Sequence, residues 1–350
     1  MSHHVDLDIQ KLNARREDYE RHRTAFLTAG AVAGIASFIY TAFKLKEAID
    51  LNREKEKIAT KCDAPGSIPS ETFKTEAGEK RKILVHDENG NVVVPTGNSV
   101  VSAFPREIKV KLPTSGVDPS ASPGTAALRD DQGSEFTLVG LGMRTVTFIG
   151  IQVYLVGFYV ATQDIAQLQH YLVKKVNQGA TTLIPSEKDA LRKALLDPAE
   201  GEETWDSILK ESGCRTLFRI TPVRDTDFHH LRDGFVRAIA ARSQGNRGCN
   251  DEAFGSAMKD FKTLFARGQV PKKREMLLCR DDQGVLSVMY GDDKKREVLG
   301  TVSDERVGRL LWLNYLAGNK VASEAARQNI IEGVMEFVER PVGTVATQVI

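Results

Sequence analysis

The chain has 350 residues, of which 41% are apolar and 27% are charged, and its formal net charge is +1. This balance gives no strongly basic face of the kind that nucleic-acid-binding proteins carry, so we expect no nucleic acid partner. The four cysteines, Cys62, Cys214, Cys249 and Cys279, show no CxxC or Cys/His metal-ligand spacing. We therefore expect free thiols, no metal site, and one large domain with appendages.

A charge-free run of twenty residues, Thr24 to Phe43, follows a polar N-terminal segment at residues 1–23. At about 1.5 Å per residue, this length matches a bilayer core of about 30 Å. The sequence therefore predicts a transmembrane helix at 24–43 and a membrane as partner. Basic residues balance on its two sides, so the positive-inside rule leaves the orientation open. A buried helix of a soluble domain is the alternative, and the dense flanking charges disfavour it.

Residues 44–134 are predicted to form a charged helix extension, a hairpin and a linker. The hairpin is expected at 82–95, with the Asn-Gly pair at 89–90 in its turn, because that pair tolerates the positive φ of a tight turn. A stretch rich in Pro, Ser and Gly then leads to the folded domain. We expect this domain at 135–340 and a C-terminal tail at 341–350.

The stretch from Glu135 to Ala161 is almost wholly apolar but contains one arginine, Arg144. Its alternation predicts two or three consecutive strands, with glycines marking the bends. A buried guanidinium is costly unless it meets a carboxylate, a carbonyl or an anionic ligand. We therefore predict that Arg144 points into a pocket or a paired site. The alternatives are a structural ion pair and a strand edge that faces water.

The pattern G-x-G-x-R at 140–144, followed by F-I-G-I-Q-V-Y-L-V-G-F-Y-V, resembles the first core strands of the chalcone isomerase fold family. A helix pair, a strand hairpin and two closing helices follow in that family's order, at 227–265, 275–290, 310–318 and 323–338. With its N-terminal span, the chain is most similar to the fungal mitochondrial chalcone-isomerase-like branch, the "altered inheritance of mitochondria" group. The resemblance implies an α+β fold, with an antiparallel sheet and helices mainly on one face. It also implies a single-pass mitochondrial inner-membrane protein whose domain faces the intermembrane space.

In that family, an arginine equivalent to Arg144 faces the ligand cleft. True isomerases have a threonine after the aromatic residue of the next segment, where this chain has Ile149. In isomerases, the first helix of the helix pair carries a tyrosine and an asparagine that orient the substrate oxygens and a water molecule. When the helix pair is aligned, Arg232 and Ile239 stand near these two positions in this chain. A late-helix position that carries a hydroxyl side chain in isomerases is occupied here by Tyr315, with Asn314 beside it. The resemblance therefore makes Arg144, Ile149, Asn314 and Tyr315 the candidate ligand-binding residues.

The isomerase reaction is a ring closure that depends on hydrogen-bond donors aimed at a developing enolate, so losing most donors should remove most of the rate. We therefore favour a non-catalytic module that binds a lipophilic anion, a fatty acid or haem, at Arg144, as fatty-acid-binding relatives do. The first alternative is an intramolecular lyase of the chalcone isomerase type with Arg144 as its catalytic residue. The second is a non-catalytic scaffold of the mitochondrial inner membrane with a closed cleft.

Haem is the one cofactor that the resemblance suggests, and no cofactor is required. Histidine is the likeliest iron ligand in this chain, which makes His229 and His230 the candidate haem ligands. The sequence contains no C-x-x-C-H attachment motif. It also lacks the H-E-x-x-H, G-x-S-x-G, P-loop and dinucleotide motifs of common enzyme classes.

Overall fold

The computed structural model describes residues 19, 72–74, 80–82, 85–88, 90–112, 133–146, 150–244, 247–292 and 295–339. The chain divides into two compact units, Met1–Pro65 and Gly66–Ile350, and Tyr19 alone is described in the first. The predicted transmembrane helix at Thr24–Phe43, Ile149 and the tail at 341–350 lie outside the described residues. Among the helices that are described, none is long and apolar enough to cross a membrane.

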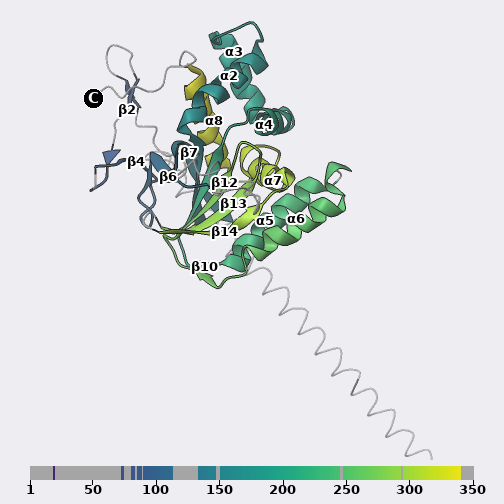
Figure 1. Cartoon of the computed structure of the whole chain (residues 1–350). Helices are drawn as coiled ribbons and strands as arrows, with labels where there is room; N and C mark the ends of the chain where they lie inside the picture. The colour runs from purple at the N-terminus through teal and green to yellow at the C-terminus, as the bar shows by residue number, and fades with distance from the viewer. Residues whose placement is uncertain are drawn as a thin grey trace, which may run out of the picture. The chain divides into compact units, whose positions relative to one another are not determined.

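The second unit is built on a seven-stranded antiparallel sheet with the strand order β14-β13-β12-β9-β8-β7-β6 (Figure 1). Its strands are β6 (Glu107–Val110), β7 (Ser134–Val146), β8 (Ile151–Ala161), β9 (Thr216–Pro222), β12 (Glu275–Arg280), β13 (Leu286–Gly291) and β14 (Arg296–Val302). The two long strands β7 and β8 confirm the consecutive strands predicted from Glu135 to Ala161. The hairpin predicted near 275–290 is formed by β12 and β13.

Three smaller sheets are described besides this one. They are β1 (Thr72–Lys74) with β2 (Lys80–Lys82), the three-stranded group β3 (Val85–His86), β4 (Val92–Pro95) and β5 (Ala103–Pro105), and β10 (Thr226–Asp227) with β11 (Gln269–Val270). Gly90, in the turn between β3 and β4, has a φ of 80°, as expected for the predicted hairpin turn. Because β6 pairs with β7, the main sheet takes in residues from before Glu135.

Seven described α-helices pack mainly on one face of the sheet, as the fold resemblance implies. They are α2 (Ile165–Val176), α3 (Pro185–Leu196), α4 (Glu200–Glu211), α5 (Phe228–Ser243), α6 (Glu252–Thr263), α7 (Glu305–Leu316) and α8 (Glu324–Glu339). Aspartates begin three of them: the side chains of Asp227, Asp251 and Asp304 accept hydrogen bonds from backbone N–H groups in the first turns of α5, α6 and α7.

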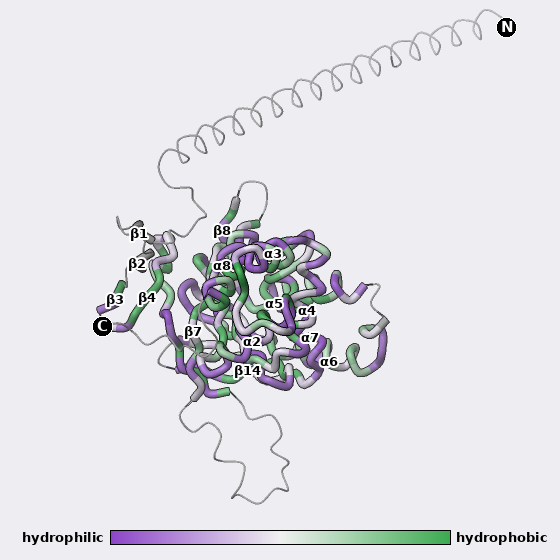
Figure 2. Tube along the Cα trace, turned by 90° about the horizontal axis from the view of Figure 1, so that it is seen from above, coloured by the Kyte–Doolittle hydropathy of each residue, from purple (hydrophilic) through white to green (hydrophobic). Residues whose placement is uncertain are grey.

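Two apolar cores lie on the two faces of the sheet. The larger core, between sheet and helices, contains the fully buried Trp205 and Trp312. The smaller core, on the other face, includes Phe104 from β5 and Phe136 and Tyr159 from the long strands. In Figure 2 the apolar stretches, drawn green, gather in the interior of this unit.

Two glycines of β7 let α8 approach the strand at backbone distance. A Cβ atom built on Gly140 would lie 2.5 Å from the nitrogen of Ile330, and one built on Gly142 would lie 2.3 Å from that of Ala326. The two glycines are two strand residues apart, a distance of about 6.6 Å along β7, and their neighbours in α8 are four helix residues apart, a distance of about 6 Å along the helix axis. The spacings match, so both glycines can contact the same side of α8. The register between β7 and β8 also shifts between Leu138 and Gly140, a bulge of the kind that bends a strand. Gly150, with a φ of 67°, lies in the turn between β7 and β8, as predicted for a glycine that marks a bend.

Candidate functional site

Arg144 lies where the close contact between β7 and α8 ends. Arg144 follows Gly140 and Gly142 at the same two-residue spacing on β7. The residue four positions before Ala326, the neighbour of Gly142, is Ala322, which lies just before α8 begins. At this point the Nη1 of the Arg144 guanidinium donates a hydrogen bond to the Ala322 carbonyl oxygen at 2.5 Å. The side chain is half-buried.

The loop between α7 and α8 is fastened to β7 by a second hydrogen bond. The Ser323 hydroxyl donates to the carbonyl oxygen of Met143 at 2.7 Å and accepts from the Ala326 N–H at 3.1 Å. Ser323 therefore caps α8 and ties its first turn to the strand. This fixes the N-terminal end of α8, where the helix dipole is positive, beside Arg144.

Two tyrosines complete the site. Tyr154 on β8 lies directly opposite Arg144 in the strand register, and directly opposed residues share one face of a sheet. The guanidinium carbon of Arg144 is 6.0 Å from the centre of the Tyr154 ring. The hydroxyl oxygen of Tyr154 is 2.7 Å from that of Tyr315, which α7 contributes. We call these three residues the Arg144–Tyr154–Tyr315 cluster.

Both hydroxyls of the cluster stay protonated at neutral pH. Burial raises the pKa of Tyr154, although Arg144 and the bond to Tyr315 act in the opposite direction. Burial also raises the pKa of Tyr315 well above its ordinary value. The two hydroxyls share one hydrogen bond, so one of their two protons remains available to an acceptor. Within the described ranges, Arg144 forms no ion pair with a carboxylate.

The structure brings some of the predicted site residues together. Tyr315 is fully buried and belongs to the cluster. Asn314 is half-buried, and its backbone carbonyl accepts a hydrogen bond from the Ala322 N–H at 2.7 Å, so it shapes the loop that Arg144 contacts. Ile149 lies outside the described residues. Tyr154 was not among the predicted site residues.

The two residues on α5 that stand near the family's tyrosine and asparagine lie in different surroundings. Ile239 is fully buried in the larger core, and the Arg232 guanidinium is paired with the neighbouring Asp233 at 2.9 Å.

The candidate haem ligands lie on the first turn of α5, and both are exposed. The Nδ1 atom of His230 is 2.5 Å from the Asp227 carboxylate, which also caps the helix. The ring of His230 is therefore already engaged in a local contact. Neither histidine is on an element that contributes to the Arg144–Tyr154–Tyr315 cluster.

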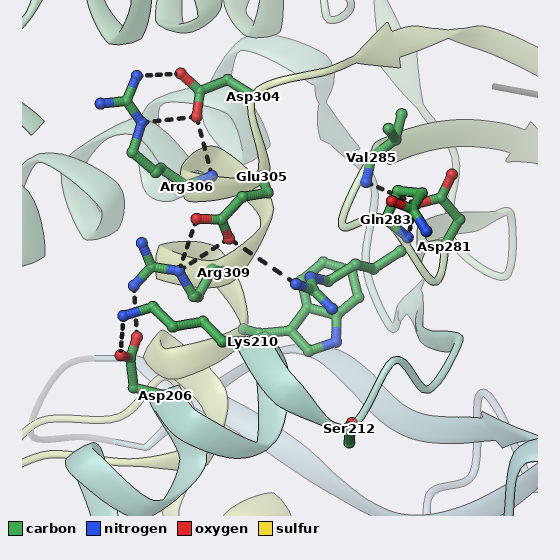
Figure 3. A network of polar contacts seen from close by, with 12 residues as sticks. Asp206, Lys210, Ser212, Asp281, Gln283, Val285, Asp304, Glu305, Arg306 and Arg309 are labelled. Carbon is green, nitrogen blue, oxygen red and sulfur yellow. Dashed lines mark hydrogen bonds and ion pairs between the residues drawn. The ribbon is translucent and has the colours of Figure 1, made fainter. Parts of the chain in front are cut away.

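A polar cavity of about 370 Å³ lies elsewhere, between α4, α5 and α7. Its cations are already paired: Arg242 with Glu202, Arg306 with Asp251 and Asp304, and Arg309 with Asp206 and Glu305. Figure 3 shows Arg309 held between Glu305 and Asp206, with Lys210 also bound to Asp206. Because these charges neutralise one another, we assign this network to helix packing rather than to a ligand.

The described part of the chain contains no group of three or more His, Cys, Asp or Glu side chains that could hold a metal ion. Cys214, Cys249 and Cys279 are buried free thiols, as predicted, and Cys62 lies outside the described residues.

Comparison with solved structures finds a fatty-acid binding protein of Arabidopsis thaliana. It is 18% identical to this chain, the match covers 59% of this chain and 91% of the other, and the TM-score is 0.45.

Sequence comparison gives a family. "Altered inheritance of mitochondria protein 18, mitochondrial" of Debaryomyces hansenii is 33% identical over 225 residues, covering 62% of this chain and 73% of that protein. The protein of the same name from Lachancea thermotolerans is 32% identical over 233 residues, covering 63% and 75%. The one from Saccharomyces cerevisiae strain YJM789 is 32% identical over 220 residues, covering 61% and 67%. A family model described as "Chalcone isomerase like" matches residues 134–331, and with these fungal relatives, all named mitochondrial, it shows that the chain belongs to the chalcone isomerase-like family.

Proposed function

We propose that this protein is a mitochondrial, non-catalytic binding module for a lipophilic molecule with an anionic head group, such as a fatty acid. The observation that carries the proposal is the Arg144–Tyr154–Tyr315 cluster, in which a guanidinium without a carboxylate partner in the described residues adjoins two buried, protonated hydroxyls. A carboxylate head group would accept hydrogen bonds from both kinds of donor.

Three local features favour an anion at this position. The guanidinium offers several N–H groups, of which Nη1 donates to the Ala322 carbonyl. The tyrosine pair has one hydroxyl proton beyond its mutual bond. The N-terminal end of α8, sixteen residues long, adds the positive end of a helix dipole beside them. The apolar side chains around Tyr315, including Phe218 with its ring centre 4.6 Å from that of Tyr315, suit the hydrocarbon part of an amphiphile.

The test is a titration of the full chain with a fluorescent fatty acid. Arg144→Ala should weaken binding by at least about tenfold, because a charge-assisted hydrogen bond contributes about 1.5 to 3 kcal/mol. Arg144→Lys should recover only part of this loss, since an ammonium cannot form a bidentate pair. Arg237→Ala, which removes an exposed arginine of α5, is the matched control and should bind like the wild type.

Two results would contradict this proposal. If the wild type binds no fatty acid and Arg144→Ala unfolds the domain, the arginine is a structural clamp on Ala322, and the inner-membrane scaffold becomes the better interpretation. An isomerase would instead show saturable chalcone cyclisation that disappears in Arg144→Ala. We expect cyclisation to stay at its spontaneous rate.

Haem is the second ligand that we propose to test, because its propionates could bind the same arginine. Haem absorbance should be titrated against the wild type, Arg144→Ala and the double variant His229→Ala/His230→Ala. Loss of a ligand-bound haem spectrum in the histidine variant would support iron ligation on α5. An unchanged spectrum would reject these two ligands.

For the N-terminal region we propose a single-pass anchor at Thr24–Phe43 in the mitochondrial inner membrane, with the domain in the intermembrane space. The support is the length and apolarity of this segment. The full-length protein should resist carbonate extraction, and the domain should become protease-sensitive once the outer membrane is opened. Release by carbonate would contradict the anchor, and protection after opening would place the domain on the matrix side.

A further inference from the structure

A basic surface lies in the turns that follow β9 and precede β12. Arg224, Lys272 and Lys273 are exposed there, and within the described ranges none of the three takes part in an ion pair. Arg274, in the same turn, is bound to Asp292 and contributes no free charge. We call Arg224, Lys272 and Lys273 the basic rim.

The basic rim is at the same end of the sheet as the Arg144–Tyr154–Tyr315 cluster. Tyr154 lies between Arg144 on one side and Pro222 on the other in the strand register. The N–H of Lys273 donates to the Pro222 carbonyl at 2.9 Å. Because neighbouring strands are about 4.8 Å apart, the rim begins roughly 15 Å from Arg144. A surface that met the rim would therefore lie close to the half-buried Arg144.

Lys272 and Lys273 lie in a turn whose backbone is held by hydrogen bonds from both of their N–H groups. Among the described residues other than glycine, only Lys273 has a φ in the left-handed region, at 69°. The N–H of Lys272 donates to the Asp225 carboxylate at 2.9 Å. Asp225 offsets one positive charge and leaves the rim basic.

We propose that the basic rim docks this end of the protein on a membrane surface that contains anionic phospholipids. The inference rests on the proposed function, because a lipophilic anion is stored in bilayers and a site that opens at a bilayer surface can exchange with that store. Lysine and arginine near an anionic leaflet each strengthen attachment, by about fivefold at low salt. Three such residues give an attachment that is salt-sensitive and reversible.

The experiment uses the full-length chain held in neutral phosphatidylcholine nanodiscs, so that its N-terminal segment contributes equally in every variant. Flotation with vesicles of phosphatidylcholine alone is compared with flotation with vesicles that also contain phosphatidylglycerol. The transfer rate of a fluorescent fatty acid from each kind of vesicle is the second measurement. The test variant is Arg224→Glu/Lys272→Glu/Lys273→Glu. The matched control, Lys175→Glu/Lys259→Glu/Lys262→Glu, reverses three exposed lysines of α2 and α6 and changes the net charge equally.

The wild type and the control should float with the anionic vesicles, and the rim variant should lose at least about tenfold in this attachment and in transfer rate. Arg144→Ala should float normally but bind the fatty acid at least about tenfold more weakly, which separates failure of docking from failure of the ligand site. Equal flotation of the rim variant and the control would overturn the proposal. So would wild-type flotation that does not depend on phosphatidylglycerol.

Discussion

The hydroxyl oxygens of Tyr154 and Tyr315 lie 2.7 Å apart, although 161 positions separate the two residues in the chain. The contact joins strand β8 to α7 inside the larger core, so it ties the helical layer to the sheet at the candidate site. Tyr154→Phe should lower the free energy of unfolding by about 1 to 3 kcal/mol, because it leaves the Tyr315 hydroxyl buried without its partner.

The double variant Tyr154→Phe/Tyr315→Phe should be less destabilised than the sum of the two single variants, since it leaves no orphaned hydroxyl. Urea denaturation gives the three values. Tyr171→Phe, at a partly exposed hydroxyl bound to Glu211, is the control and should change stability by less than about 0.5 kcal/mol. Additive single effects would show that the two hydroxyls do not depend on each other.

The close approach of β7 and α8 predicts a strong dependence on glycine. Gly142→Ala should destabilise the domain by about 1 to 3 kcal/mol or more, because the new Cβ would lie 2.3 Å from backbone atoms of α8. Gly234→Ala, inside α5 with no atom within 4 Å of the new Cβ, should instead stabilise it by about 0.5 to 1 kcal/mol. Thermal denaturation of both variants checks the contrast. A stable Gly142→Ala protein would mean that the helix can move away from the strand.

Acid should weaken the network around the polar cavity. Burial alone would raise the pKa of Asp206, but hydrogen bonds from Lys210 and Arg309 outweigh it and lower the pKa. Hydrogen bonds from Arg306 lower the pKa of Asp304. A carboxyl group with a lowered folded-state pKa contributes stability above its unfolded pKa of about 4, and this stability is lost as the pH falls through the folded value.

The urea midpoint should therefore fall as the pH is lowered from about 5 to 3, and fall less in Asp206→Asn/Asp304→Asn. That variant should be the less stable protein at neutral pH. The exposed Asp282→Asn serves as the control and should follow the wild type. A double variant with the wild-type pH profile would show that these two ion pairs add nothing to stability.

The buried thiols should be inert in the folded protein. Burial raises the pKa of Cys214 to about 11 and that of Cys279 to about 12, so almost no thiolate is present at neutral pH. Iodoacetamide should leave both unmodified under native conditions and alkylate both in urea, as read by peptide mass spectrometry. Rapid native alkylation of Cys279 would mean that the smaller core opens readily.

Sequence alone predicted the parts of this fold that depend on local patterns. Alternating apolar residues predicted β7 and β8, the Asn-Gly pair predicted a turn that Gly90 confirms, and the helices have their expected order. The resemblance pointed to Arg144 and Tyr315 because the surrounding motifs align. Side-chain chemistry, local periodicity and motif spacing were sufficient for these elements.

Contacts between distant segments were beyond such reasoning. The role of Gly140 and Gly142 depends on α8, almost two hundred residues later, and a glycine in a strand looks the same whether it bends the strand or admits a helix. Tyr154 was missed because an apolar strand with aromatic residues gives no sign of which ring meets Arg144. Likewise, β6 follows the predicted hairpin closely but belongs to the main sheet, a pairing that only the folded chain reveals.

The sheet's two outer strands, β14 and β6, are linked by a single side chain. Arg296 on β14 donates from Nη1 to the carbonyl oxygen of Lys109 on β6 at 3.1 Å, while its Nε binds the buried Glu275 at 2.6 Å. An open sheet edge is a template on which another chain can add a strand. By reaching from one edge strand to a backbone acceptor of the other, Arg296 occupies a Lys109 carbonyl that an added strand could otherwise use. One buried ion pair thus also ties the first and last strands of the sheet to each other.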